Sequence, residues 1–474
     1  MITELFDVPA GAVWKHFQEM CNIPRPSGHE ERIRAHLLEI ARGHGWQSRQ
    51  DSTGNIVLAC PGIGTLGDAP VLVLQAHMDM VCEKNADTVH DFMTDPIRPL
   101  IDGDWVTADG TTLGADNGIG VALALAVAES AMDRVPLELL ITVDEERGLS
   151  GAFGCDPEII QGRRIINLDS EEDGVFIIGC AGGTDWTVSF EKSANGGSSG
   201  DCWHCCLGGF RGGHSGVDID KGRINAIRTA AAIVEALATA QSGMRVTGFA
   251  GGNAMNAIAR ECSFTVAGCA RADVEAAAAQ VLAGIRHAEP GATISAEPAA
   301  DVGEYEIPMA VVSFITAVPD GVLAMDPIYT EQVQTSSNLG VITDAADSIA
   351  IKLMGRSTIY AEQQQIGHEI EQAAAVLGGT ITVGSDFPGW APKPDSSLLQ
   401  LGLAAYREKF DAEPRIESIH AGLECGIIGA ALGTDELLSF GPSIENAHSP
   451  DERVNIAGVE RIFRLLNALV TRRQ

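Results

Sequence analysis

Three short, largely apolar runs each end in histidine or acidic residues, and this pattern constrains the fold more than any other feature. The runs and the polar residues after them are Val71–Ala76 with His77 and Asp79, Leu137–Val143 with Glu145 and Glu146, and Ile165–Leu168 with Asp169. Strands this apolar are buried on both faces, as in a parallel sheet covered by helices. Open α/β sheets bind ligands at the carboxyl ends of their strands. We therefore predict an α/β domain with a polar site at that edge.

Spacing along extended backbone indicates different roles for neighbouring polar residues. His77 and Asp79 are two residues apart, so they point to the same side, and a carboxylate near a histidine ligand is a usual pairing. Glu145 and Glu146 are adjacent and face opposite ways. One of them can therefore bind a metal ion while the other faces a bound water as general base. The alternatives are a buried core histidine at His77 and a solvated acidic turn at the glutamates.

Two further candidate ligands lie in turns. Asp116, within the glycine-rich segment Gly110–Gly118, lies directly before an apolar helix, where it is either an N-cap or a bridging carboxylate. His448 precedes Ser449–Glu452, in which we expect an N-cap, a first-turn proline and a capping-box glutamate for the last helix. Nitrogen and oxygen ligands without thiolates suit a catalytic zinc pair, for which cobalt or manganese can substitute.

Length and charge limit the class of protein. A chain of 474 residues is too long for one ordinary core, so two domains are expected. The formal net charge of -32 disfavours nucleic-acid binding, because a surface this negative repels phosphates. No apolar run reaches the roughly 18 residues of a membrane span, and Met1–Phe17 lacks the features of a secretory signal. We therefore expect a cytoplasmic protein without a membrane partner.

Eleven cysteines are scattered along the chain, as expected of reduced thiols in a cytosolic enzyme. Cys202, His204, Cys205 and Cys206 form a local cluster that resembles half of a zinc site with thiolate ligands. We favour a strand here, because a closed structural site needs four ligands and no second cysteine pair follows at finger spacing.

The order of predicted strands and helices changes twice along the chain. Residues 1–184 alternate strands with helices, as in a mostly parallel α/β sheet. Residues 185–386 repeat the order strand, helix, strand, which predicts a smaller α+β domain with helices on one face of one sheet. Residues 387–474 alternate again and are expected to complete the first sheet. The second domain is therefore predicted to be an insertion into the first.

Motifs in nearly every part of the chain resemble those of one enzyme family. The matching segments are Gln75–Val81, Thr88–Phe92, Gly110–Gly120, Asn167–Glu172, Gly179–Gly183, Gly212–Gly216, His420–Gly426 and Ala447–Glu452. With these motifs the sequence resembles the aminoacyl-histidine dipeptidase (Xaa-His dipeptidase, peptidase D) branch of the co-catalytic di-zinc metallopeptidases. The resemblance implies hydrolysis of unblocked dipeptides, including Xaa-His.

The resemblance also implies the composition of the active site, with two Zn²⁺ per subunit. One ion would be held by Asp116, Glu146 and His448, and the other by Asp116, His77 and Asp169. Glu145 would be the general base that deprotonates the zinc-activated water and passes the proton to the leaving amine. Asp79 would orient His77.

In the family, the inserted domain is a lid and the surface through which a homodimer forms. His214 would stabilise the oxyanion of the tetrahedral intermediate, in its own subunit or across the dimer. Asn256 and Arg356 would position the substrate, with Arg356 at its terminal carboxylate. Without the resemblance, His214 would be assigned to a turn, Asn256 to a helix or turn cap, and Arg356 to the charged surface. Met255 and Ala259 depart from the family pattern, which bears on substrate preference rather than on metal chemistry.

Two other functions are compatible with the same ligand set. An N-acyl amino acid amidohydrolase or a carboxypeptidase would use the same di-metal site on different substrates. A non-catalytic metal-binding scaffold would have no need of an acid at the position of Glu145, so its presence argues for an enzyme.

Overall fold

The chain divides into two units in the computed structural model, which describes residues 2–130, 133–194, 201–299 and 305–472. Unit 1 consists of Met1–Gly179, Pro392–Ser418 and Leu423–Gln474, and unit 2 of Cys180–Ala391 and Ile419–Gly422. Unit 1 holds a mixed sheet with a parallel centre, and unit 2 an antiparallel sheet with helices. The predicted fold class is therefore confirmed. No sequence signal indicated the return of residues 419–422 to unit 2.

Unit 1 is built around an eight-stranded sheet with the strand order β1-β2-β6-β3-β7-β23-β8-β22. The strands are β1 (Gln47–Gln50), β2 (Ile56–Cys60), β3 (Leu72–His77), β6 (Leu137–Thr142), β7 (Arg164–Asn167), β8 (Val175–Cys180), β22 (Arg415–Ile419) and β23 (Leu437–Ser439). β3 pairs in parallel with β6 and β7, and β7 pairs in parallel with β23. Every residue of β3 and β6 is buried, as expected for central strands covered on both faces.

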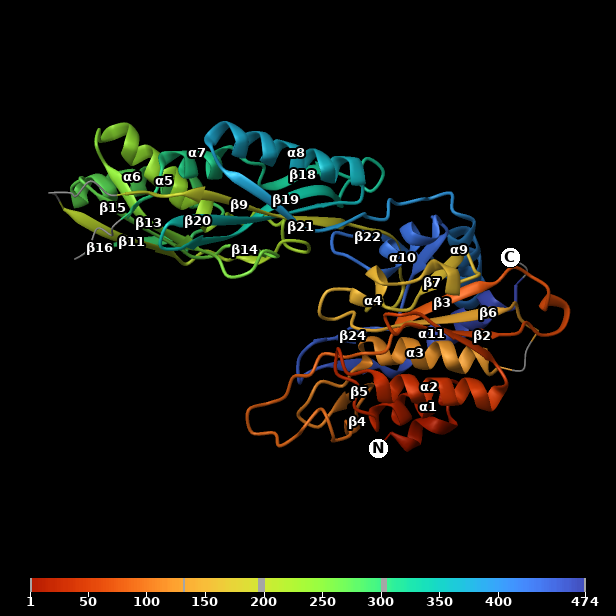
Figure 1. The fold of residues 1–474 in the computed structure, drawn as a ribbon. Coiled ribbons are helices and arrows are strands. Elements are labelled where there is room, and N and C mark those ends of the chain that lie inside the picture. The colour runs from red at the N-terminus through yellow and green to blue at the C-terminus, as the bar shows by residue number, and fades with distance from the viewer. Residues whose placement is uncertain (1, 131–132, 195–200, 300–304, 473–474) are drawn as a thin grey trace. The chain divides into compact units, whose positions relative to one another are not determined.

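Helices α1 to α3 lie on one side of strands β3 and β6, and α4 and α10 lie on the other (Figure 1). The helices of unit 1 are α1 (Gly11–Cys21), α2 (Glu31–His44), α3 (Ala115–Ala128), α4 (Ser150–Phe153), α9 (Ser397–Phe410), α10 (Glu424–Leu432) and α11 (Ile456–Val470). In α3 every residue except Asp116 is buried, as expected for a helix that is apolar on all sides. No helix in the described ranges is long and apolar enough to cross a membrane.

The last helix begins later than the sequence predicted. Asn455 is its N-cap, with a side-chain oxygen that accepts a hydrogen bond of 2.8 Å from the main-chain nitrogen of Gly458. Between Glu452 and this helix lies β25 (Arg453–Asn455), which belongs to a small sheet with β24 (Ile444–Glu445), β5 (Trp105–Ala108) and β4 (Pro99–Asp102). The predicted capping role of Glu452 is wrong, because the backbone after it is extended and pairs with β5.

Unit 2 contains an antiparallel sheet with the order β16-β11-β15-β13-β19-β20-β9-β21, and β18 pairs with β19 beside this path. Its strands are β9 (Gly182–Glu191), β11 (Cys202–Gly208), β13 (Arg245–Gly251), β15 (Cys262–Ala267), β16 (Thr293–Pro298), β18 (Gly321–Met325), β19 (Val333–Asp344), β20 (Ser348–Ser357) and β21 (Thr380–Phe387). Helices α5 (Ala226–Ala240), α6 (Arg271–Ile285), α7 (Met309–Ala317) and α8 (Tyr360–Leu377) gather on one face (Figure 1). The cysteine cluster lies in β11, as the sequence predicted.

Candidate metal centre

The carboxyl ends of β3, β6 and β7 bring most of the predicted ligands of unit 1 together. His77 is the last residue of β3, and the loops directly after the three strands carry Asp79, Glu145, Glu146 and Asp169. These ends meet because β3 pairs in parallel with both neighbours. Ligand atoms lie within 4.8 Å of one another in three overlapping groups: His77, Asp116 and Asp169; Asp116, Glu146 and His448; and His77, Glu145 and Glu146.

Asp116 lies between the two histidines and turns one carboxylate oxygen toward each. Its Oδ1 is 3.1 Å from Nε2 of His77, and its Oδ2 is 3.1 Å from Nε2 of His448. Glu146 Oε2 lies 2.9 Å from the same nitrogen of His448, and Asp169 Oδ1 lies 3.5 Å from that of His77. The backbone of Asp116 is not helical, and its side-chain hydrogen bonds are with the two histidines rather than with main-chain nitrogens of α3. The arrangement has two similar halves that share one carboxylate.

Asp79 connects His77 to the loop that carries the two glutamates. Its Oδ1 lies 3.3 Å from Nδ1 of His77, on the ring edge opposite Asp116. The main-chain nitrogens of Glu145 and Glu146 donate hydrogen bonds of 3.2 and 3.3 Å to its two carboxylate oxygens. Asp79 is fully buried, so these contacts are shielded from water. One side chain therefore fixes both the imidazole plane and the backbone of the loop after β6.

The histidines of the cluster hold protons strongly. Burial lowers the pKa of His77, but Asp169 and Asp116 outweigh burial and raise it well above the usual range. Hydrogen bonds with Asp116 and Glu146 raise the pKa of His448 to about 11. Both shifts show that the surrounding carboxylates favour positive charge at the two imidazoles.

Carboxylate oxygens of the cluster are left without hydrogen-bond donors among the described residues. Glu146 Oε1 and Asp169 Oδ1 are buried and accept no hydrogen bond there. Burial raises the pKa of Asp169 to about 6 and that of Glu145 to about 9. Keeping such buried carboxylates charged costs free energy unless a cation binds them. Imidazole and carboxylate ligands in two groups that share Asp116 fit a pair of divalent cations.

A buried polar network next to the cluster had no assigned role in the sequence. Glu424, at the start of α10, is fully buried and accepts hydrogen bonds of 2.6 Å from Gln75 and Thr142. The amide of Gln75 also accepts a hydrogen bond of 2.6 Å from Asn167. Burial raises the pKa of Glu424 to about 8. An acid within the apolar stretch of α10 is the signal that could have identified it.

Unit 2 contains the three residues predicted to bind substrate. His214 accepts hydrogen bonds at Nδ1 from the main-chain nitrogens of Gly216 and Val217, at 3.1 and 3.3 Å. Burial and the nearby Arg356 lower the pKa of His214, so the neutral ring carries its proton on Nε2. Asn256 is exposed, and its carbonyl accepts a hydrogen bond of 2.8 Å from the main chain of Ser215.

Arg356 is not the surface charge that the sequence left as an alternative. Only 6% of the residue is exposed, and its Nε lies 3.5 Å from Oγ of Ser215. No carboxylate among the described residues forms an ion pair with it, and burial lowers its pKa to about 10. Burial and Arg356 lower the pKa values of the nearby His214 and His420, and Nε2 of His420 lies 2.7 Å from Oγ of Ser336. A buried guanidinium without an acidic partner is able to bind an anion.

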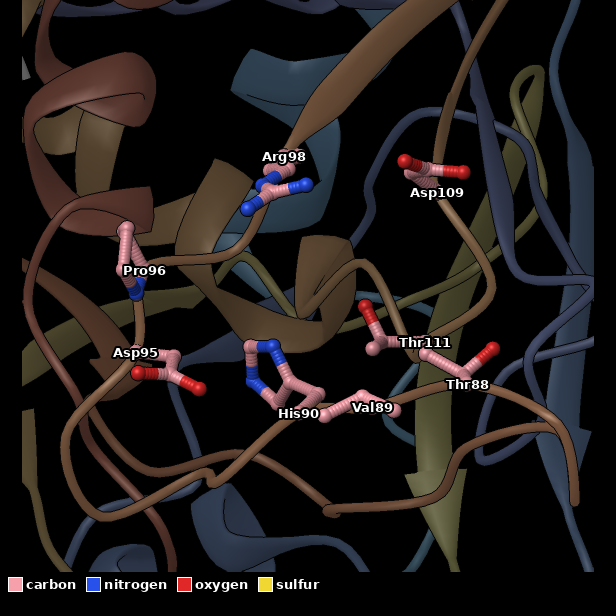
Figure 2. A pocket seen from close by; sticks show the side chains of 8 residues that line it. All are labelled: Thr88, Val89, His90, Asp95, Pro96, Arg98, Asp109 and Thr111. Atoms are coloured by element: carbon pink, nitrogen blue, oxygen red, sulfur yellow. The ribbon is translucent and has the colours of Figure 1, made fainter.

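A separate cavity of about 260 Å³ lies in unit 1, among the segments on either side of β4 and β5 (Figure 2). Arg98, Asp95 and Asp109 give it mixed charge. It contains none of the residues of the metal cluster. The cavity therefore does not explain the chemistry predicted for the strand ends.

Each of the comparisons with known proteins identifies peptidases as similar to this chain. The sequence profile of peptidase family M20/M25/M40 matches residues 73–472. The cytosol non-specific dipeptidase of Escherichia coli (strain K12) is 36% identical over 484 residues, which cover 99% of each chain. The crystal structure of aminoacylhistidine dipeptidase from Vibrio alginolyticus superposes with a TM-score of 0.91, at 35% identity and 99% coverage of both chains. Aminopeptidase PepT from Bacillus cereus, at 16% identity and a TM-score of 0.58, shares the fold over 98% of each chain.

Proposed function

The chain belongs to peptidase family M20/M25/M40, and we propose that it is a metal-dependent dipeptidase of unblocked dipeptides, including Xaa-His. The observation that carries this proposal is Asp116, whose two carboxylate oxygens face His77 and His448 separately. Similarity to a cytosol non-specific dipeptidase and to an aminoacylhistidine dipeptidase, each along 99% of both chains, supports the substrate class. A cytoplasmic location is part of the same proposal.

We infer that the cluster holds two Zn²⁺, for which Co²⁺ or Mn²⁺ can substitute. His77 and Asp169 would bind one ion, Glu146 and His448 the other, and Asp116 both. When bound, such ions act as Lewis acids and lower the pKa of water toward neutrality. Oε1 of Glu146 and Oδ1 of Asp169 are buried and accept no hydrogen bond among the described residues, which supports this assignment, because a cation would satisfy both.

Glu145 is the general base in this proposal. It takes a proton from the attacking water and returns it to the leaving amine, so that no free amide anion forms. Its backbone is fixed by the hydrogen bond to Asp79, and its neighbour Glu146 faces His448. Burial raises the pKa of the Glu145 carboxyl to about 9, so without nearby positive charge this acid would hold its proton at neutral pH. Positive charge at the cluster would bring that pKa closer to the working pH.

The residues of unit 2 have binding roles in the proposal. The proton on Nε2 of His214 is free to be donated to the carbonyl oxygen on which charge develops, because Nδ1 already accepts two hydrogen bonds. Arg356 binds the terminal carboxylate of the dipeptide, and its lack of an acidic partner among the described residues supports this. Asn256 is assigned to substrate positioning alongside them.

The function is tested by comparing substrates on the metal-loaded protein. We expect hydrolysis of Ala-His and of other unblocked dipeptides, with little activity on N-acetyl amino acids. Activity restricted to acylated substrates would instead identify an amidohydrolase on the same site. Metal binding without turnover of any of these substrates would identify a metal-binding scaffold.

Replacing Arg356 should weaken substrate binding more than it slows chemistry. For Arg356→Met we expect KM for Ala-Ala to rise about 10- to 100-fold, since a charged hydrogen bond contributes about 1.5–3 kcal/mol. The value of kcat should change much less. Steady-state kinetics checks this, with Arg286→Met, at an exposed position in unit 2, as the matched control. An unchanged KM would remove Arg356 from the substrate site.

We further infer that the protein is a homodimer that associates through unit 2. Apolar side chains that are exposed on and near β18 support this: Val322, Leu323, Met325 and Ile328 are 37%, 44%, 41% and 64% exposed. Exposed clusters of this kind commonly mark association surfaces. Sedimentation equilibrium should give twice the chain mass of 49.8 kDa, and Leu323→Lys should shift the protein toward monomer. A monomeric wild-type protein would contradict the inference.

A further inference from the structure

Glu452 binds the turn that carries Asp116, which is the role that replaces its predicted place in a helix cap. Its Oε2 accepts hydrogen bonds of 2.7 and 2.9 Å from the main-chain nitrogens of Leu113 and Gly114. Its Oε1 accepts hydrogen bonds of 2.7 and 3.2 Å from those of Ala115 and Asp116. Four successive N–H groups thus converge on one carboxylate, of which only 2% is exposed. Such a concave set of N–H groups is a strong anion-binding arrangement.

The same carboxylate joins two segments that are far apart in sequence. Glu452 lies four residues after His448, in the loop that leads into β25. Its main-chain nitrogen donates to the carbonyl of Ser449 at 3.0 Å, and its own carbonyl accepts a hydrogen bond of 2.9 Å from Thr107. Glu452 therefore connects the loop that carries His448 to the turn that carries Asp116. This connection holds His448 close to the shared carboxylate.

Arg25 holds the opposite side of the same turn. Its guanidinium donates to the carbonyls of Met78, at 3.1 Å, and Asp79, at 2.8 Å, and also to the carbonyl of Gly114. Gly114 has a φ of 70°, and a Cβ at this position would come within 2.5 Å of the Arg25 guanidinium. The turn is thus held from two sides: its N–H groups donate to the Glu452 carboxylate, and the carbonyl of Gly114 accepts from the Arg25 guanidinium. Since Met78 follows His77 directly, Arg25 also links the turn to the second histidine.

We propose that Glu452 is a positioning residue of the metal centre, which fixes the main chain of residues 113–116 and so directs the Asp116 carboxylate between the two ion positions. Only two side-chain torsions separate the clamped backbone from the carboxylate oxygens that face His77 and His448. Without these hydrogen bonds the turn could move, and the two Asp116 oxygens would then rotate away from His77 and His448. The proposal rests on the proposed di-metal function, because it concerns the ligand shared by both ions.

Glu452→Gln tests this with little change in volume. The amide places an NH₂ group against two main-chain N–H groups that need an acceptor. We expect the dissociation constant for the second Co²⁺ ion added to metal-free protein to rise about 10- to 100-fold, as when partners that orient ligands are removed. The visible spectrum of the Co²⁺ protein should change as well. In the loaded enzyme, kcat should fall by about the same factor while KM stays within twofold.

Glu445→Gln is the matched control, because Glu445 is an exposed glutamate in the same region that pairs with Arg453. It should bind Co²⁺ and turn over substrate as the wild type does. Glu452→Asp keeps the charge but shortens the reach, so an intermediate effect on Co²⁺ binding is expected, and this variant decides the matter if Glu452→Gln does not fold. Wild-type Co²⁺ affinity and spectrum in a folded Glu452 variant would overturn the proposal. Co²⁺ binding is measured without substrate, so a failure of the dipeptidase assignment would be seen separately.

Discussion

Glu145→Gln is expected to lower kcat about 10²- to 10⁴-fold while two metal ions stay bound, because general-base catalysis contributes that range. The amide has almost the volume of the carboxylate, and the main-chain hydrogen bond from residue 145 to Asp79 is unaffected. The side chain then has no oxygen that can take the proton of the attacking water. Steady-state kinetics and metal analysis on the same sample measure both parts of the expectation.

The neighbouring position supplies a contrasting variant. Glu146→Gln should lower metal content, since Glu146 lies 2.9 Å from His448 within one of the ligand groups. Glu158→Gln, at an exposed position in unit 1, should change neither quantity. The division of roles between the two adjacent glutamates would be falsified if Glu145→Gln kept full activity or if Glu146→Gln alone lost turnover with both ions retained.

Asp116→Ala should remove the binding of both ions and with it nearly all activity, by at least about 10³-fold in kcat/KM. This exceeds the roughly 10- to 100-fold effects of residues that only orient ligands, because one carboxylate serves both halves of the centre. Without it His77 and His448 lose the oxygens that lie 3.1 Å from their Nε2 atoms. Metal content after dialysis and activity with added Zn²⁺ or Co²⁺ are the measurements.

Chelation of the wild-type protein provides the comparison. Metal removal should abolish activity, and added Zn²⁺ or Co²⁺ should restore it, whereas Asp116→Ala should stay inactive at the same concentrations. Asp169 belongs to one ligand group only, so Asp169→Asn should weaken the binding of one ion more than that of the other. Two ions bound with wild-type affinity in Asp116→Ala would show that this residue does not bridge them.

Local rules explain how much of the centre was predictable. His77 and Asp79 were paired from their spacing of two, and the structure brings Asp79 within 3.3 Å of the ring of His77. The expectation that Glu145 and Glu146 lie on extended backbone and face opposite ways is wrong, because β6 ends at Thr142 and the two glutamates lie in the turn that follows. Ligand atoms of both glutamates lie within 4.8 Å of those of His77. The pairing of His77 with Asp79 depends on residues two positions apart, so it could be predicted locally, whereas the turn after β6 could not.

Other expectations failed or stayed undecided because several local structures satisfied the same sequence. The segment Ser449–Glu452 has the composition of a helix start, yet the backbone after it forms β25. Arg356 had no signal that separated a surface charge from a buried one, and the packing of unit 2 leaves it only 6% exposed. Local preferences are weak compared with the free energy of burial and of long-range pairing, so tertiary structure overrides them.

The sequence by itself determined the parallel α/β character of unit 1 and the polar residues at the strand ends, since apolar runs and their polar boundaries are local patterns. Only the tertiary structure decided which distant residues meet there. Asp116 and His448 are 332 positions apart, and their contact depends on how α3 and the loop before β25 pack. Glu452 shows the same dependence, because its four hydrogen-bond donors come from a turn that no local pattern could connect with it. Periodicity reports the surroundings of each element, whereas the partner of each side chain is fixed by packing across the whole unit.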